Sequence, residues 1–182
     1  MFQTSNLYQT ILGWAMSPNV FSSILGWLLL AGIVEEIIKA LVLLVILKMS
    51  KERLSPETML FYGLMSGLGF GIYEGVTYQM GQNNSLETPL AYILNVMRLT
   101  SLPFLHAVWS GICGYLLAFA WYSSKHSRGL YVAAIGIPAL LHAFHNGTSL
   151  IIPPLGLLVD FIAVVALLVY RSRAKELERA TS

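Results

Sequence analysis

The chain has 182 residues, of which 56% are hydrophobic and 11% are charged, with a mean hydropathy of +0.68 and a net charge of +2. This apolar balance excludes an ordinary soluble domain and predicts a membrane protein. The small net charge, with no basic and aromatic pattern, argues against nucleic acid as a partner. Because spans of about 20 residues use up nearly all of the sequence, we expect one transmembrane helical domain over residues 1–182, surrounded by the lipid bilayer.

Five apolar segments predict transmembrane helices, at about residues 22–47, 58–80, 104–122, 129–151 and 155–171. Residues 90–100 are also apolar, but they carry Asn95 and Arg98 and lead into Pro103. Because proline interrupts helices, we expect an interfacial helix over 90–100, then a break, then the third span. Residues 7–16 fit a second interfacial helix. The predicted fold class is all-α, with about five transmembrane helices and one or two interfacial helices.

Positive charge alternates between successive connections. The segments at 48–57, at 123–128 and after Tyr170 carry Lys or Arg, whereas those before the first span, at 81–89 and at 152–154 carry none. Since positively charged loops stay in the cytoplasm, this pattern predicts an external N-terminus and a cytoplasmic C-terminus. We expect a bacterial or archaeal plasma membrane. The first 20 residues contain no Lys or Arg, so we do not expect a cleavable signal peptide there.

Three charged residues, Glu35, Glu36 and Lys39, lie near the middle of the first span. On a helix of about 100° per residue, Lys39 falls about 40° from Glu35 and about 60° from Glu36, on one face. Ionised groups cost several kcal/mol each in hydrocarbon, so an ion pair with Lys39 explains one carboxylate. The other carboxylate needs a second cation, a proton or a metal.

The second span carries a stripe of glycines at every fourth position, Gly63, Gly67, Gly71 and Gly75. Such a stripe lets another helix approach closely, either within the chain or in a homodimer. Glu74 falls about 20° from Gly63 on the helical wheel, so it points into a helix interface and not at lipid. A protonated carboxyl group that only makes a hydrogen bond is the alternative interpretation of Glu74.

Polar residues also lie inside the third and fourth spans, at His106 and at His142, His145 and Asn146. The last three fall within about 100° of one another on a helix. Histidine is a usual metal ligand and general acid or base, and an amide can stabilise an oxyanion. A lone membrane histidine more often only joins two helices, but polar groups at overlapping depth on four spans predict a shared site. Asp160, with no motif around it, is interpreted as a helix-start or packing residue.

These residues, in this order, resemble the PrsW family of intramembrane proteases. The motifs are Glu35-Glu36-x-x-Lys39, Phe70-x-x-x-Glu74, His106, and His142-x-x-x-Asn146. The resemblance covers about residues 30–150. The family is similar to the CAAX-prenyl endopeptidase and Abi group, from whose EExxxR and FxxxH motifs Lys39 and Glu74 depart. The resemblance implies a polytopic protease, with site-1 cleavage of a membrane anti-sigma factor as the type activity.

The primary hypothesis is hydrolysis of peptide bonds in a membrane protein substrate by water held in an intramembrane cavity. The predicted catalytic residues are Glu35 or Glu36 as general base, Lys39 beside them, and Asn146 or His145 at the oxyanion. The predicted ligands of a zinc ion are Glu74, His106 and His142. A metal-free mechanism, in which a glutamate and a histidine activate water directly, is the alternative.

Two functions of other classes use the same residue types. A proton- or cation-coupled transporter also buries Glu, Lys and His, although five unequal spans lack the paired halves that transporters usually show. A noncatalytic membrane scaffold would explain the glycine stripe and the basic tail. It predicts that replacing the buried Glu and His residues leaves function intact.

Overall fold

The computed structural model describes residues 6–52, 54–81, 88–123, 127–149 and 151–181. Every regular element in these ranges is helical, which confirms the all-α class. The elements are α1 (Asn6–Ala15), α2 (Val20–Trp27), the π-helix η1 (Leu28–Gly32), α3 (Ile33–Met49), α4 (Pro56–Met80), α5 (Thr88–Tyr122), α6 (Ser127–Ser149) and α7 (Pro153–Thr181). Of the predicted connections over 81–89 and 123–128, residues 82–87 and 124–126 lie outside the described residues.

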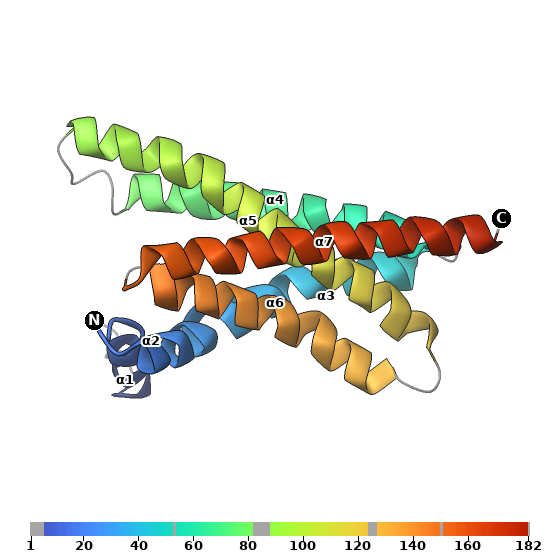
Figure 1. Ribbon diagram of the computed structural model, residues 1–182, viewed down its shortest axis with the longest axis horizontal. Coiled ribbons are helices and arrows are strands. Elements are labelled where there is room, and N and C mark those ends of the chain that lie inside the picture. The colour runs from blue at the N-terminus through green and yellow to red at the C-terminus, as the bar shows by residue number, and fades with distance from the viewer. Residues whose placement is uncertain (1–5, 53, 82–87, 124–126, 150, 182) are drawn as a thin grey trace.

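The long helices run side by side along one axis and alternate in direction (Figure 1). The turn between α6 and α7 lies at the same end as α1 and the start of α5, and the C-terminus lies at the other end. α2, η1 and α3 follow one another without a loop. The core joins residues from α3, α4, α5, α6 and α7, among them Leu43, Met59, Ile112, Ala134 and Ala163.

By length and composition, two of the described helices could cross a membrane: α5, and α7 over Pro153–Glu176. The apolar window of α5 is 78% buried and that of α7 is 11% buried, so α5 is the central helix and α7 lies at the periphery. The number of five crossings stays a prediction.

The predicted break between an interfacial helix and the third span is wrong, because α5 continues from Thr88 to Tyr122 with Pro103 inside it. The hydroxyl groups of Thr100 and Ser101 donate to carbonyls of the preceding turn, at 2.8 Å each. Pro103 is buried against α4, where a Cβ on Gly71 would lie 2.6 Å from the Pro103 Cα. Local hydrogen bonds before the proline and close packing against α4 therefore accompany the continuous helix. The predicted helix over 7–16 is present as α1.

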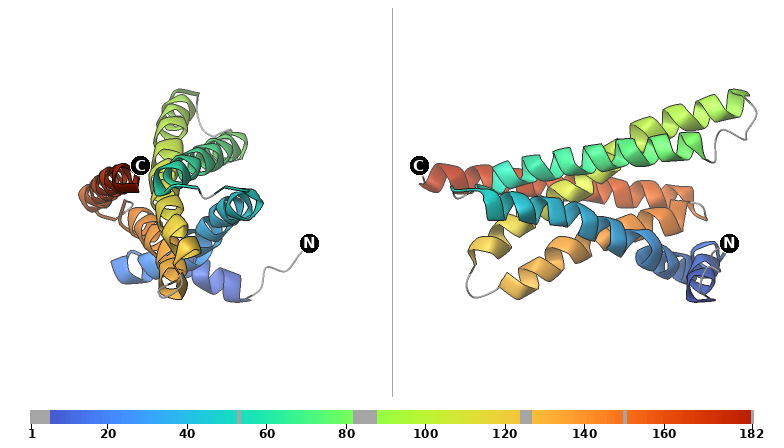
Figure 2. Two further views of the ribbon diagram at one scale, coloured as in Figure 1. Left: turned by 90° about the vertical axis from the view of Figure 1, so that its right-hand side faces the viewer. Right: turned by 180° about the vertical axis from the view of Figure 1, so that it is seen from behind.

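The glycine stripe of α4 packs against α5 within the chain, and the two helices lie side by side (Figure 2). A Cβ on Gly63 would meet the Ser110 carbonyl, and a Cβ on Gly67 would meet the His106 carbonyl. The absence of side chains lets the two backbones touch. This contact fixes the register that brings the α4 residue Glu74 beside α5.

Candidate active site

The π-helix η1 ends directly before the charged turn of α3. Its Gly32 lies against α6, where a Cβ would be 2.6 Å from the Ala139 carbonyl oxygen. A π-turn takes more residues than an α-turn and changes which face the following residues present. In α3, Glu36 and Lys39 face the interior while Ile37 and Ile38 face outward. The polar side of α3 is thus turned into the bundle.

Glu36 and Lys39 form a fully buried ion pair. Lys39 Nζ lies 2.5 Å from Glu36 Oε1, with side-chain exposures of 1% and 0%. This confirms that Lys39 partners one of the two carboxylates, and Glu36 is that one. Glu35 is 20% exposed and lies at the edge of the cluster.

A continuous chain of contacts joins α3, α5 and α4. Lys39 Nζ is 2.7 Å from His106 Nδ1, and His106 Nε2 is 2.7 Å from Glu74 Oε2. Because an ammonium only donates, Nδ1 accepts, and the Nε2–H then donates to the Glu74 carboxylate. Phe70, one turn before Glu74, supports both partners: its ring centroid is 4.7 Å from Lys39 Nζ and 5.3 Å from the His106 ring. The FxxxE spacing therefore places a ring and a carboxylate on the same face.

His142 brings α6 into this cluster. Its Nδ1 lies 3.3 Å from Glu36 Oε1 and 3.9 Å from Glu35 Oε2. Trp109 stacks on the His142 ring at 4.5 Å and 20°, and meets the His106 ring edge-on at 5.2 Å. Trp109 is fully buried. The sequence analysis did not identify it, although it follows His106 by three residues and so shares its face.

His145 has a different partner. Its Nδ1 lies 2.8 Å and 3.0 Å from the two carboxylate oxygens of Asp160 on α7, and its ring is 5.8 Å from that of Trp109. Asp160, which the sequence identified only as a helix-start or packing residue, thus joins α7 to α6 through His145. Asn146 is partly buried, one turn after His142.

Three residues could hold a metal ion: Glu35, His106 and His142 offer one ligand atom each, all within 4.8 Å of one another. Two of these were predicted as ligands, and Glu35 stands where Glu74 was predicted. Glu74 contacts His106 instead. Two imidazoles and a carboxylate are a ligand set that catalytic zinc uses.

Unpaired atoms support the fit to a cation. Glu35 Oε2, Glu36 Oε2 and His142 Nδ1 are buried, and no other described residue gives them a hydrogen bond. Buried polar atoms without a partner are costly, so a cation or water is expected to meet them. His106 already has a partner at each nitrogen, so its ligation would require Lys39 or Glu74 to move.

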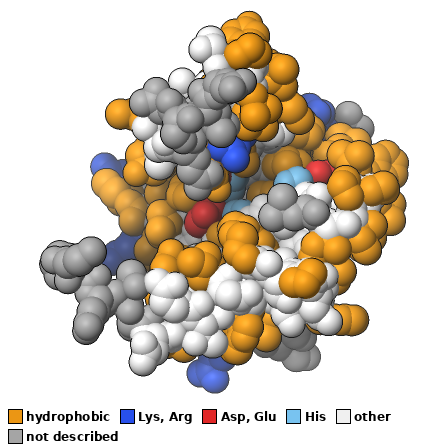
Figure 3. All heavy atoms as spheres, turned by 90° about the vertical axis from the view of Figure 1, so that its left-hand side faces the viewer, with side chains coloured by type: hydrophobic (Ala, Val, Ile, Leu, Met, Phe, Trp, Pro, Cys, Tyr) orange, Lys and Arg blue, Asp and Glu red, His pale blue; other side chains and the backbone are white. Residues whose placement is uncertain are grey.

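The site opens toward the end of the molecule where α1 lies. From that side the surface is hollowed, with acidic and histidine side chains in and beside the hollow and apolar side chains around it (Figure 3). Glu35 and Glu74, each with 20% side-chain exposure, are the more accessible carboxylates of the cluster. Substrate and water can therefore approach the cluster from this end.

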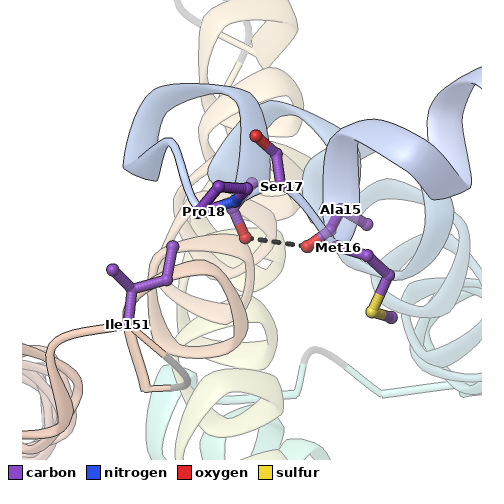
Figure 4. Close-up of a pocket in the computed structure, with 6 residues that line it drawn as sticks. Ala15, Met16, Ser17, Pro18 and Ile151 are labelled. Carbon is purple, nitrogen blue, oxygen red and sulfur yellow. Dashed lines mark hydrogen bonds between the residues drawn. The ribbon is translucent and has the colours of Figure 1, made fainter.

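A separate pocket lies where α1 meets α2, beside the end of α6 (Figure 4). It is lined by Ala15, Met16, Ser17, Pro18, Ser23 and Ile151. The Ser23 hydroxyl donates to the Ala15 carbonyl at 2.9 Å and holds the turn between the two helices. None of the clustered residues lines this pocket.

Comparison with protein families matches residues 2–171 to the PrsW family of intramembrane metalloproteases. Comparison with curated proteins and with solved structures gave no match. The matched range contains the whole cluster and extends the resemblance seen in the motifs, whereas the relationship to the CAAX and Abi group stays a prediction. The chain belongs to the PrsW family, whose members are described as intramembrane metalloproteases.

Proposed function

We propose that this protein cleaves peptide bonds of membrane proteins with a water activated by the carboxylates and imidazoles of α3, α4, α5 and α6. The observation that carries the proposal is their convergence. Glu36 Oε1 lies 3.3 Å from His142 Nδ1, and His106 Nε2 lies 2.7 Å from Glu74 Oε2. The chain also belongs to a family of proteases. Burying polar groups inside a membrane protein costs free energy, so a cluster of such groups indicates a functional site.

Glu36 is the proposed general base. Its Oε1 is held by Lys39, and its Oε2 has no hydrogen-bond partner among the described residues. One oxygen is thus fixed while the other is available to take a proton from water. Lys39 positions the carboxylate and balances its charge. Asn146 is the proposed donor to the oxyanion.

The residues that would hold the metal are Glu35, His142 and His106, and zinc is the proposed ion. When bound, it supplies a Lewis acid that polarises the scissile carbonyl and acidifies water. Glu74 accepts from His106 Nε2–H and orients that ring, as carboxylates do behind histidine ligands. In the metal-free alternative, Glu36 and His142 alone activate the water. Metal analysis and chelator treatment of the purified protein separate the two, because full activity without bound metal would dismiss the zinc version.

Five membrane crossings are proposed, with the N-terminus outside and the C-terminus in the cytoplasm. The support is that α1 and the α6–α7 turn lie at one end and the C-terminus at the other (Figure 1). Under this arrangement, the hollow faces the external side. An anti-sigma factor is the first candidate substrate, as the family resemblance implies.

The experiment compares the membrane proteome of cells that carry the wild type with that of cells that carry Glu35→Gln. Glu35→Gln keeps the side-chain shape and removes a carboxylate that has no ion pair with Lys or Arg among the described contacts, so the fold is expected to persist. We expect one or a few membrane proteins to accumulate uncut. The matched control is Glu57→Gln. It changes a partly exposed carboxylate whose Oε1 lies 3.9 Å from Lys175 Nζ. Equal processing in all three strains at matched expression would favour the scaffold.

A further inference from the structure

A second acid and imidazole pair lies beside the cluster. It has no role in the proposed function, in which Asn146 and not His145 serves the oxyanion. His145 and Asp160 join α6 to α7 through contacts of 2.8 Å and 3.0 Å. Their side chains are 21% and 16% exposed, whereas the side chains of His106 and His142 are almost fully buried. The pair is therefore partly exposed, whereas the two inner histidines are not.

The contact fixes which nitrogen of His145 is available. A carboxylate only accepts hydrogen bonds, so the Nδ1–H of His145 donates to Asp160. The other nitrogen, Nε2, is used by no contact between the described residues, and it is the atom left to exchange a proton. A carboxylate behind an imidazole holds its orientation and stabilises its charged form, as in hydrolytic triads.

Trp109 connects the pair to the cluster. Its ring lies 5.8 Å from the His145 ring and 4.5 Å from the His142 ring. His142 and His145 are three residues apart on α6, so they lie on neighbouring faces of the same turn. His145 is therefore a titratable group about one helical turn from His142 and outside the water-activating set.

We infer that His145 is a catalytic acid for the leaving amine and that Asp160 is its positioning residue. The inference rests on the proposed hydrolysis. Water adds to the carbonyl carbon and gives one proton to Glu36. His145 acts in this step as the imidazolium, with its Nδ1–H on Asp160 and a second proton on Nε2. The C–N bond then breaks, its electron pair stays on nitrogen, and that nitrogen takes the Nε2 proton of His145. The products are a carboxylic acid and an amine, and the proton on Glu36 returns to His145 through water.

The test compares two leaving groups. The probes are a transmembrane peptide and its depsipeptide, in which an ester replaces the scissile amide. The peptide spans the site at which the wild type cuts the protein that accumulates uncut in the Glu35→Gln membranes. An alcohol leaves more easily than an amine without protonation, so loss of the acid affects the ester less. We expect His145→Gln and Asp160→Asn to slow amide cleavage by about 10²- to 10⁴-fold and ester cleavage by less than about 10-fold. Glu176→Gln, on an exposed carboxylate of α7, is the control.

The outcomes separate this inference from the proposed function. If the wild type cleaves neither probe, the proposed hydrolysis fails. If it cleaves both and the two variants lose amide and ester cleavage equally, the pair only joins α6 to α7 and the inference is overturned. Thermal unfolding in detergent is measured for each variant. If Asp160→Asn does not fold, the same ratio of amide to ester cleavage is measured on His145→Gln alone, and that ratio decides.

Discussion

Lys39 is the residue on which the charge balance of the cluster depends. Its ammonium contacts Glu36 Oε1 and His106 Nδ1 at 2.5 Å and 2.7 Å, and its side chain is 1% exposed. Removing one member of a buried pair leaves the other charge without compensation, at a cost of about 3–5 kcal/mol. The pair is therefore expected to be coupled far more strongly than a surface ion pair.

Lys39→Met is predicted to lower the free energy of unfolding by about 3–5 kcal/mol, because Glu36 is left charged in an apolar interior. Lys39→Met combined with Glu36→Gln is predicted to recover most of that loss without recovering cleavage. Unfolding in a graded series of denaturing detergent measures both. A double variant that is as unstable as the sum of the two single variants would contradict the coupling.

The ammonium of Lys39 also occupies the position from which a metal ion would bind His106 Nδ1. It donates to Nδ1, and Nε2 faces Glu74, so a cation at Nδ1 and the Lys39 contact exclude each other. Zinc is therefore predicted to stabilise Lys39→Met more than the wild type, since no ammonium competes with it. The measurement is the shift in unfolding temperature with added zinc, which reports binding to the folded state. An equal shift in both proteins, or a larger one in the wild type, would show that Lys39 does not occupy a metal position.

At the scale of the helices, the contact between α4 and α5 positions two of the polar residues. Gly67 is predicted to tolerate no side chain, because a Cβ there would meet the His106 carbonyl. Gly67→Ala should cost about 1–3 kcal/mol through overpacking and should reduce cleavage by displacing His106. Gly69→Ala lies two residues away, where a Cβ would meet nothing within 4 Å.

Gly69→Ala is the matched control on the same helix. It should raise stability by about 1 kcal/mol through helix propensity and leave cleavage unchanged. Thermal unfolding in detergent and cleavage of the same substrate compare the two variants. Equal stability of the two would mean that the close approach of α4 and α5 is not maintained in the membrane.

Some structural features of the helices could be predicted from the sequence, and others could not. The periodicity of the glycines and Glu74 identified the buried face of α4 correctly, because a helical wheel needs only local geometry. The break predicted from Pro103 was wrong, since the effect of this proline depends on the packing of α4 against α5. The π-helix before α3 could not be read either, because Leu28–Gly32 has the composition of any apolar helix.

At the scale of the whole molecule, the convergence of polar residues from four helices was predictable from the position of each residue along its helix and from the helix face on which it lies. Which residues pair was only partly predictable. Lys39 and Glu36 are close in sequence, whereas the contacts of His145 with Asp160 and of His106 with Lys39 depend on which helices are neighbours. No feature of the sequence near Asp160 identifies α6 as its partner, so only the tertiary structure could assign it.

The orientation of the bundle determines which side of the membrane supplies substrate and water to the hollow. The single cysteine, Cys113, is buried, so single cysteines can be introduced against an unreactive background. With five crossings, Met80→Cys and Ile152→Cys should react with a membrane-impermeant maleimide in intact cells, whereas Lys51→Cys should react only after permeabilisation. Lys51 follows α3, Met80 ends α4 and Ile152 precedes α7. Each position therefore reports one side of the membrane. If Lys51→Cys and Met80→Cys were labelled from the same side, α4 would not cross the membrane, and the polar cluster would have to be reached by another route.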